Sequence, residues 1–134
     1  MPPKLYFYDT GIACSLLGIS NARQISTHAA KGPLFENMIL SELLKERLNK
    51  GLQDNLYYWR DKTGNEVDIV ADRAGKLAVM ELKAGQTISP DFFKGLDYFS
   101  SLYKKTAGKL LIYGGKEKQK RSNGIVVTPW NELI

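Results

Sequence analysis

Two strands of a predicted hairpin carry charged side chains among apolar ones. The stretch EVDIVADRAGKLAVMELKAG, residues 66–85, places Asp68 on the first strand and Glu81 and Lys83 on the second. Side chains alternate between the faces of a strand, so Glu81 and Lys83 share a face. With a turn at residues 73–76, Asp68 falls opposite Glu81, with Cβ atoms roughly 5 Å apart. Like charges directly opposite each other are destabilising, and a divalent cation bound between the two carboxylates would offset their repulsion.

The donor atoms of this pair indicate which cation it would bind. Carboxylate oxygens favour Mg²⁺ or Mn²⁺ over zinc, and the sequence contains neither a Cys/His cluster nor an H-E-x-x-H motif. Strict alternation along the first strand also puts Val67 with Ile69 on one face and Asp68 with Val70 on the other. A plainer interpretation stays open, in which Asp68 faces solvent and the acid and lysine of the second strand form a rim ion pair.

A third acid, Glu36, falls on the apolar side of a predicted helix. Projected at about 100° per residue, it shares an arc with Ile39, Leu40, Leu43 and Leu44. A carboxylate on a buried face is costly unless something pairs with it. The partner is either Arg47 in the same arc or a site shared with Asp68 and Glu81, where Glu36 would be a third metal ligand.

The elements that must position these residues are predicted from apolar spacing and from turn residues. The first half is expected to hold a short strand, a brief helix closed by Gly18, a loop and a long helix, at residues 4–11, 12–18, 19–31 and 33–51. The second half is expected to hold a strand, the hairpin, a helix and two strands, at residues 55–61, 66–85, 90–105, 109–115 and 124–130. This order predicts an α/β fold with a central mixed β-sheet flanked by helices.

Size and composition set the broad class of the protein. A chain of 134 residues with 43% hydrophobic residues is expected to form one domain with a real core. The net charge of +5 favours an acidic partner such as nucleic acid. The lone Cys14 cannot form an internal disulfide, and no segment has the pattern of a signal peptide or a membrane span, so a soluble, cytoplasmic protein is expected.

A basic run is the candidate nucleic-acid contact. The segment KEKQKRS, residues 116–122, holds Lys116, Lys118, Lys120 and Arg121 in one predicted loop. Such a loop either contacts a phosphate backbone or is ordinary solvated surface, and both interpretations stay open. The aromatic run of Tyr57, Tyr58 and Trp59 is expected in the core rather than stacked on bases.

Several of these segments resemble known families. Asp68 followed by Glu81-Leu82-Lys83 resembles the PD-(D/E)xK motif of the restriction-endonuclease-like superfamily, and the order helix, three strands, helix, strand resembles its core. The blocks KLYFYDTGIACSLLG, GPLFENMILSELLK, YYWRDKTGNEVDIV and ELKAG resemble those of a domain of unknown function. In many bacterial and archaeal AAA-type proteins that domain follows the ATPase module.

The resemblance implies a nuclease-type centre within a restriction-endonuclease-like domain over residues 1–134. Asp68 and Glu81 would bind Mg²⁺ or Mn²⁺, and Glu36 matches the acid that the superfamily often supplies from its first core helix. Lys83 would position the attacking water or stabilise the charge of the phosphorane. Two departures are that Val67 stands where the motif has proline, and that the helix after the motif offers only Lys94 as a supporting residue.

The resemblance also implies partners and an alternative. DNA would be the substrate, and the chain would be the C-terminal part of a longer AAA-type ATPase whose upstream module is its partner. The alternative is a non-catalytic module that binds DNA or docks onto that ATPase. Because no G-x-x-x-x-G-K-[S/T] loop occurs, the chain alone is not expected to hydrolyse ATP. The oligomeric state is left open.

Overall fold

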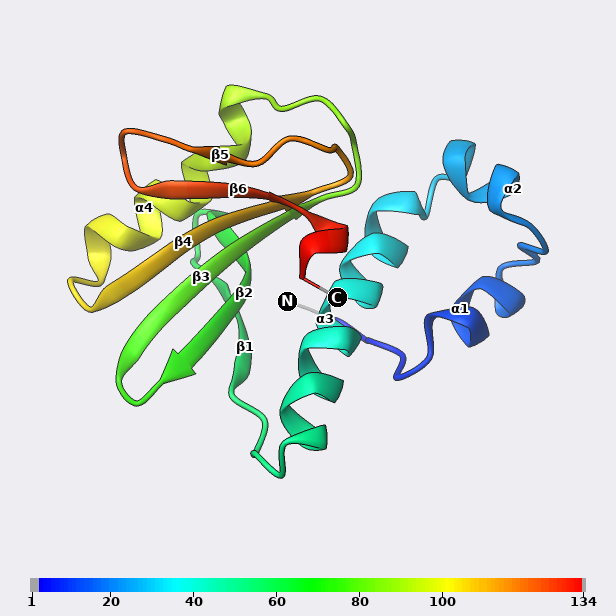
Figure 1. Ribbon diagram of the computed structural model, residues 1–134, viewed down its shortest axis with the longest axis horizontal. Coiled ribbons are helices and arrows are strands. Elements are labelled where there is room, and N and C mark those ends of the chain that lie inside the picture. The colour runs from blue at the N-terminus through cyan, green and yellow to red at the C-terminus, as the bar shows by residue number, and fades with distance from the viewer. Residues whose placement is uncertain (1–2, 134) are drawn as a thin grey trace. The chain divides into compact units, whose positions relative to one another are not determined.

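The computed structural model describes residues 3–133, which divide into two compact units on either side of the bond between Gln53 and Asp54. Figure 1 shows the helices of the first unit and the strands of the second. Together they form an α/β fold with four α-helices and a six-stranded mixed sheet in the described residues. The coarse fold class predicted from the sequence is confirmed. No helix in residues 3–133 is long and apolar enough to cross a membrane.

The first unit contains three helices, α1 (Thr10–Leu16), α2 (Ala22–Thr27) and α3 (Lys31–Asn49). Asp9 caps α1, because its Oδ1 accepts the Gly11 N–H at 2.7 Å. Gly51, which follows α3, has φ 70°, a left-handed conformation that glycine adopts without strain. The predicted short helix and the predicted long helix are therefore confirmed, and each begins and ends two residues earlier than predicted.

Two predictions for this unit are wrong. Residues 4–9 form no strand, because the main chain of Phe7 pairs with a side chain instead of a neighbouring strand: Asn37 Oδ1 accepts its N–H at 2.7 Å. Asn37 Nδ2 also donates to Phe7 O at 3.1 Å. The predicted loop at residues 19–31 contains α2, which begins with a capping box in which Asn21 and Gln24 satisfy each other's main-chain N–H groups.

The second unit contains a sheet in the order β1-β2-β3-β4-β6-β5. Its strands are β1 (Leu56–Arg60), β2 (Glu66–Arg73), β3 (Lys76–Lys83), β4 (Thr106–Tyr113), β5 (Gln119–Lys120) and β6 (Ile125–Pro129). β3, β4 and β6 run parallel, whereas the β1–β2, β2–β3 and β5–β6 pairs are antiparallel. β5 forms inside the segment predicted as a basic loop, so that part of the prediction is wrong.

The β2–β3 hairpin has the predicted turn. Asp72 pairs with Leu77 and Arg73 with Lys76. Ala74 and Gly75, between them, have φ 54° and 84°. Two central residues with positive φ fit the twist of a two-residue hairpin turn, so the register of the hairpin is fixed at this end.

One face of the sheet is covered within this unit by a 3₁₀ turn, η1 (Pro90–Phe93), and the helix α4 (Lys94–Leu102) that follows it. Apolar residues from both layers form a single buried cluster: Val67, Val70, Val79, Phe93, Leu96, Phe99, Leu111, Tyr113, Ile125 and Val127. Trp59 packs against this cluster and meets the Phe99 ring edge-on at 5.2 Å, as expected for a core aromatic. Tyr57 of the same aromatic run is instead 61% exposed, so the prediction of a core position is wrong for Tyr57. The packing of the cluster fixes α4 over β2 and β3, where the charged residues of the hairpin lie.

Candidate functional site

A β-bulge in β2 surrounds Asp68. Tyr57 of β1 pairs with Val70, whereas Trp59, two residues on, pairs with Val67, three residues back along β2. β2 therefore carries one extra residue between these pairs, which disrupts strict alternation. In agreement, Val67 joins Val70 and Val79 in the same buried cluster, although alternation alone separates Val67 from Val70. The predicted alternation is wrong at this point.

The bulge accompanies an unusual main-chain contact of Asp68. Regular pairing of β2 with β3 ends at Ile69 and Met80, and beyond it the Leu82 N–H donates to Asp68 Oδ2 at 2.8 Å. Asp68 is buried, with 7% of its surface exposed. A side-chain carboxylate has thus taken the acceptor position of a strand, which holds it against β3.

Glu81 is the other buried acid of the hairpin, with 8% of its surface exposed. Its Oε1 lies 2.7 Å from Lys83 Nζ, while Oε2 is buried without a hydrogen-bond partner among the described residues. Burial, and then the negative charge of Asp68, raise the pKa of Glu81 to about 7, against the opposing effect of Lys83. The two carboxylates therefore repel each other in a poorly solvated place.

Lys83 supplies the compensating cation. Burial pulls its pKa down, but the hydrogen bond and charge of Glu81, with the charges of Asp68 and Glu66, outweigh burial and hold the pKa above its ordinary value. Lys83 Nζ also lies 5.3 Å from the centre of the Phe92 ring, within the range of a cation–π contact. The structure thus brings Asp68, Glu81 and Lys83 together at one end of the hairpin, as the sequence predicted.

Sequence reasoning missed two residues around this group. Glu66, at the start of β2, adds negative charge that acts on both Glu81 and Lys83, and its Oε2 accepts from Tyr58 Oη at 2.8 Å. Gly95 lies in α4 where a Cβ atom would come within 2.4 Å of Glu66 O and 3.8 Å of Glu81 Oε2. A glycine inside a predicted amphipathic helix was the available signal for such a close approach.

Gly95→Ala tests whether this close approach positions the acidic group. Because the added methyl would clash with the main chain of β2, α4 must shift, and we expect a loss of about 2 kcal/mol in the free energy of unfolding. Gly108→Ala is the matched control, since its Cβ would make an ordinary contact of 3.8 Å with Ala78 Cβ. Urea denaturation of both variants measures the difference, and equal stabilities would contradict close packing at Gly95.

Glu36 belongs to the unit of residues 1–53. Its Oε1 accepts from Lys4 Nζ at 3.0 Å and from Tyr6 Oη. Arg47, the other predicted partner, instead donates from Nε to Gln53 O at 2.8 Å. Glu36 is thus paired within its own unit, although with different residues from those expected, and its part in a metal site stays a prediction.

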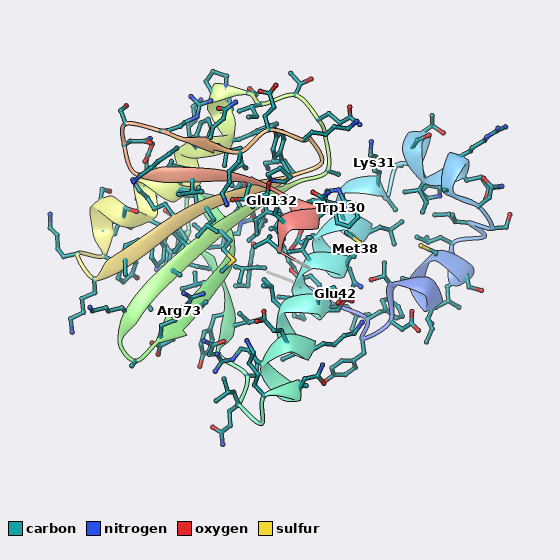
Figure 2. The ribbon with its side chains drawn as sticks, viewed as in Figure 1. Lys31, Met38, Glu42, Arg73, Trp130 and Glu132 are labelled. Carbon is teal, nitrogen blue, oxygen red and sulfur yellow. The ribbon has the colours of Figure 1, made fainter. Side chains whose placement is uncertain are left out.

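The four cations of the basic segment have different surroundings. Lys118 Nζ lies 3.2 Å from Oε2 of Glu132, which Figure 2 labels, and the Arg121 guanidinium lies 4.4 Å from the centre of the Phe93 ring. Lys116 and Lys120 are exposed, and no ion pair is formed by either in residues 3–133. Two of the four side chains are therefore available to a phosphate without breaking an existing contact.

The acidic pair suits a magnesium-type ion. Within either unit, the described residues contain no group of three or more His, Cys, Asp or Glu side chains arranged to hold a metal. Mg²⁺, however, is commonly bound through only one or two carboxylates, with waters and substrate phosphates completing its shell. The buried, unpartnered Oε2 of Glu81 and the hard oxygen donors of both acids fit that mode of binding.

Comparison with known proteins places the chain among uncharacterised relatives. A family model described as a domain of unknown function, DUF4143, matches residues 31–133. The uncharacterized proteins Rv2008c of Mycobacterium tuberculosis and Mb2031c of Mycobacterium bovis are each 28% identical over 134 residues, which is 98% of this chain and 28% of the relative. The chain thus spans less than a third of the length of these relatives. No solved structure gives a significant match.

Proposed function

The chain belongs to the DUF4143 family, a domain of unknown function, and from its buried carboxylate pair we propose that it is a nuclease-like domain that hydrolyses phosphodiester bonds of DNA with Mg²⁺ or Mn²⁺. The observation that carries the proposal is the orphan Oε2 of Glu81, buried near the like charge of Asp68. Such a pair is costly for stability, and a bound divalent ion would remove the cost. The proposed fold type is restriction-endonuclease-like, and its support is the strand order together with the motif of Asp68, Glu81 and Lys83.

The residues of the site have distinct proposed roles. Asp68 and Glu81 hold the ion, which when bound would polarise the scissile phosphate and acidify a water molecule. Lys83, fixed by Glu81 Oε1 and Phe92, orients the attacking water and offers positive charge to the developing phosphorane. Gly95 lets α4 approach without a side chain between the helix and the acids.

The relatives are more than three times as long as this chain, and the part of them outside the matched region concerns the expected rate of DNA cleavage. We propose that the rest of such a longer polypeptide, including an ATPase module, positions the DNA, and that the chain alone therefore cleaves slowly. Positioning supplies a large share of the rate enhancement in phosphoryl transfer, so its loss lowers the rate without removing the metal site.

A metal titration and a nicking assay test the proposed function. Calorimetry with MnCl₂ at pH 8 should show binding to the wild-type chain, and supercoiled plasmid should be nicked slowly with Mn²⁺ or Mg²⁺ but not with Ca²⁺ or EDTA. Absence of both metal binding and nicking, in this chain and in a full-length relative, would reject the nuclease. That result would favour the second candidate below.

The second candidate is a non-catalytic module that binds DNA or docks onto an ATPase. It is favoured by apolar side chains at the surface of the first unit, where Leu5, Tyr8 and Leu16 are 82%, 78% and 74% exposed. Exposed apolar residues gathered in one short segment often mark a protein contact. A docking module has no need of a buried acidic pair, so the metal titration separates the two candidates.

Lys116 and Lys120 are expected to contact the DNA backbone. In the Lys116→Gln/Lys120→Gln variant, the slope of log K against log salt should fall in magnitude by about 1.8, because each lost phosphate contact removes about 0.9. Fluorescence anisotropy over a range of salt concentrations measures this slope. As a control, Lys45→Gln/Lys50→Gln removes the same charge from α3 and from the residue that follows it. If both variants kept the wild-type slope, the segment would be solvated surface only.

A further inference from the structure

A recess of about 440 Å³ opens in the second unit, at the end of the hairpin away from Glu81. It lies between the β2–β3 turn and the loop from α4 to β4, and is lined by Ala74, Gly75, Lys76, Lys104, Lys105 and Thr106. Main-chain contacts hold the two loops together, because Leu77 N donates to Lys105 O at 3.1 Å and Leu77 pairs with Thr106. The pairing of the sheet therefore fixes the spacing of the two loops that form the recess.

Cations surround this recess without carboxylate partners. Lys76 stands directly opposite Arg73 in the hairpin register, and Figure 2 labels Arg73. Like charges in that position destabilise a hairpin. Lys104 and Lys105 add two more charges from the facing loop, and all four side chains are exposed.

Four other lysines of the same unit have acidic partners, which the cations of the recess lack among the described residues. Lys83, Lys94, Lys109 and Lys118 each pair with a carboxylate. Within residues 3–133, no ion pair involves Arg73, Lys76, Lys104 or Lys105. The nearest acid in sequence, Asp72, accepts the Gly75 N–H at 2.8 Å within the turn. The recess thus gathers several positive charges with no carboxylate from the described part of this unit paired to them.

We propose that the recess formed by Lys76, Lys104 and Lys105, with Arg73 at its edge, binds the phosphate backbone of a nucleic acid. The inference rests on the proposed function in that it names a second contact for the same substrate. Lys76 and Glu81 are about 17 Å apart along β3 at roughly 3.3 Å per residue. That distance corresponds to about five phosphates along one strand of DNA, so one strand can reach both places. A series of phosphates explains several separate lysines better than a single small anion does.

The test replaces Lys76, Lys104 and Lys105 together by Gln. Binding of a fluorescently labelled oligonucleotide is followed by anisotropy over a range of NaCl concentrations, in EDTA so that no cleavage occurs. The magnitude of the slope of log K against log salt should fall by about 2.7, which is three contacts at about 0.9 each. The matched control, Lys45→Gln/Lys50→Gln/Lys62→Gln, removes the same charge from exposed positions elsewhere and should keep most of the wild-type slope.

The remaining outcomes decide against the proposal. An equal slope in the triple variant and its control, or no binding of the oligonucleotide by the wild-type chain, would overturn it. Competition separates a backbone site from a site for one nucleotide. ATP and an unlabelled oligonucleotide are added at equal phosphate concentration, and if ATP displaced the labelled oligonucleotide equally well, the proposal would also be overturned. The anisotropy assay contains no metal, so its result does not depend on the metal titration. A failed metal titration would reject the nuclease, and the anisotropy assay would still decide whether the recess binds a phosphate backbone.

Discussion

Asp68→Asn should abolish Mn²⁺ binding and lower metal-dependent nicking by about 100- to 1000-fold. The expected size follows from losing the main electrostatic stabilisation of a phosphoryl-transfer transition state. The substitution removes the charge but keeps the side-chain volume, and the Asn oxygen can still accept the Leu82 N–H. The fold should therefore survive while the metal site fails. Calorimetry and plasmid nicking on the same preparation measure the two effects.

Two companion variants sharpen this test. Lys83→Ala should lower the rate of nicking by a similar factor but leave Mn²⁺ binding in place. The reason is that Lys83 is proposed to act on water and phosphate rather than on the metal. Asp72→Asn is the matched control, since Asp72 is an exposed acid of the same hairpin whose oxygen accepts a turn N–H. If Asp68→Asn nicked plasmid at the wild-type rate, the activity would come from a site other than this one.

The hairpin could be predicted from sequence because its signals are local. Gly75 adopts positive φ without strain at the turn, and the flanking strands carry apolar residues with few interruptions, so the pairing of Asp72 with Leu77 follows directly. The bulge at Asp68 could not be predicted, because it depends on how β1 pairs with β2 and no glycine or proline marks it. The proximity of Asp68 to Glu81 was thus expected, but the hydrogen bond to Leu82 was not.

The other surprises also depend on contacts between distant residues. Residues 4–9 have strand-like composition, yet Asn37 supplies the hydrogen bonds that a neighbouring strand would have supplied. The basic recess requires the β2–β3 turn and the α4–β4 loop to meet, and parallel pairing of β3 with β4 brings them together. Charge runs in sequence pointed instead to residues 116–122, where two of the four cations are already engaged.

Stability should depend on pH through Glu81. Its pKa is about 7 in the folded chain and near 4.5 when unfolded, so between these values the folded state binds a proton that the unfolded state has released. The free energy of unfolding therefore falls as pH rises through this window, and it reaches its lowest level above pH 7. A pKa difference of this size corresponds to about 3 kcal/mol. Because Glu81 is only 8% exposed, solvent screens little of this cost.

Glu81→Gln should consequently stabilise the protein at pH 8, by about 3 kcal/mol in the free energy of unfolding, while leaving it unchanged at pH 4. Gln is neutral, similar in volume, and retains an oxygen that can accept from Lys83 Nζ. The Lys83 side chain is 34% exposed and so keeps contact with solvent. Glu117→Gln, at an exposed acid of the same unit, should change stability by less than about 0.5 kcal/mol at either pH.

Metal linkage completes the experiment on Glu81. If Glu81 is a ligand, Mn²⁺ at 100 times its dissociation constant should stabilise the wild-type chain at pH 8 by about 2.7 kcal/mol and leave Glu81→Gln unaffected. The wild-type chain would then regain with metal most of the stability that the variant has without it. Chemical denaturation with Mn²⁺ or with EDTA, at pH 4 and pH 8, gives all the required values. A Glu81→Gln chain no more stable than wild type at pH 8 would mean that the acidic pair carries no strain for a metal to relieve.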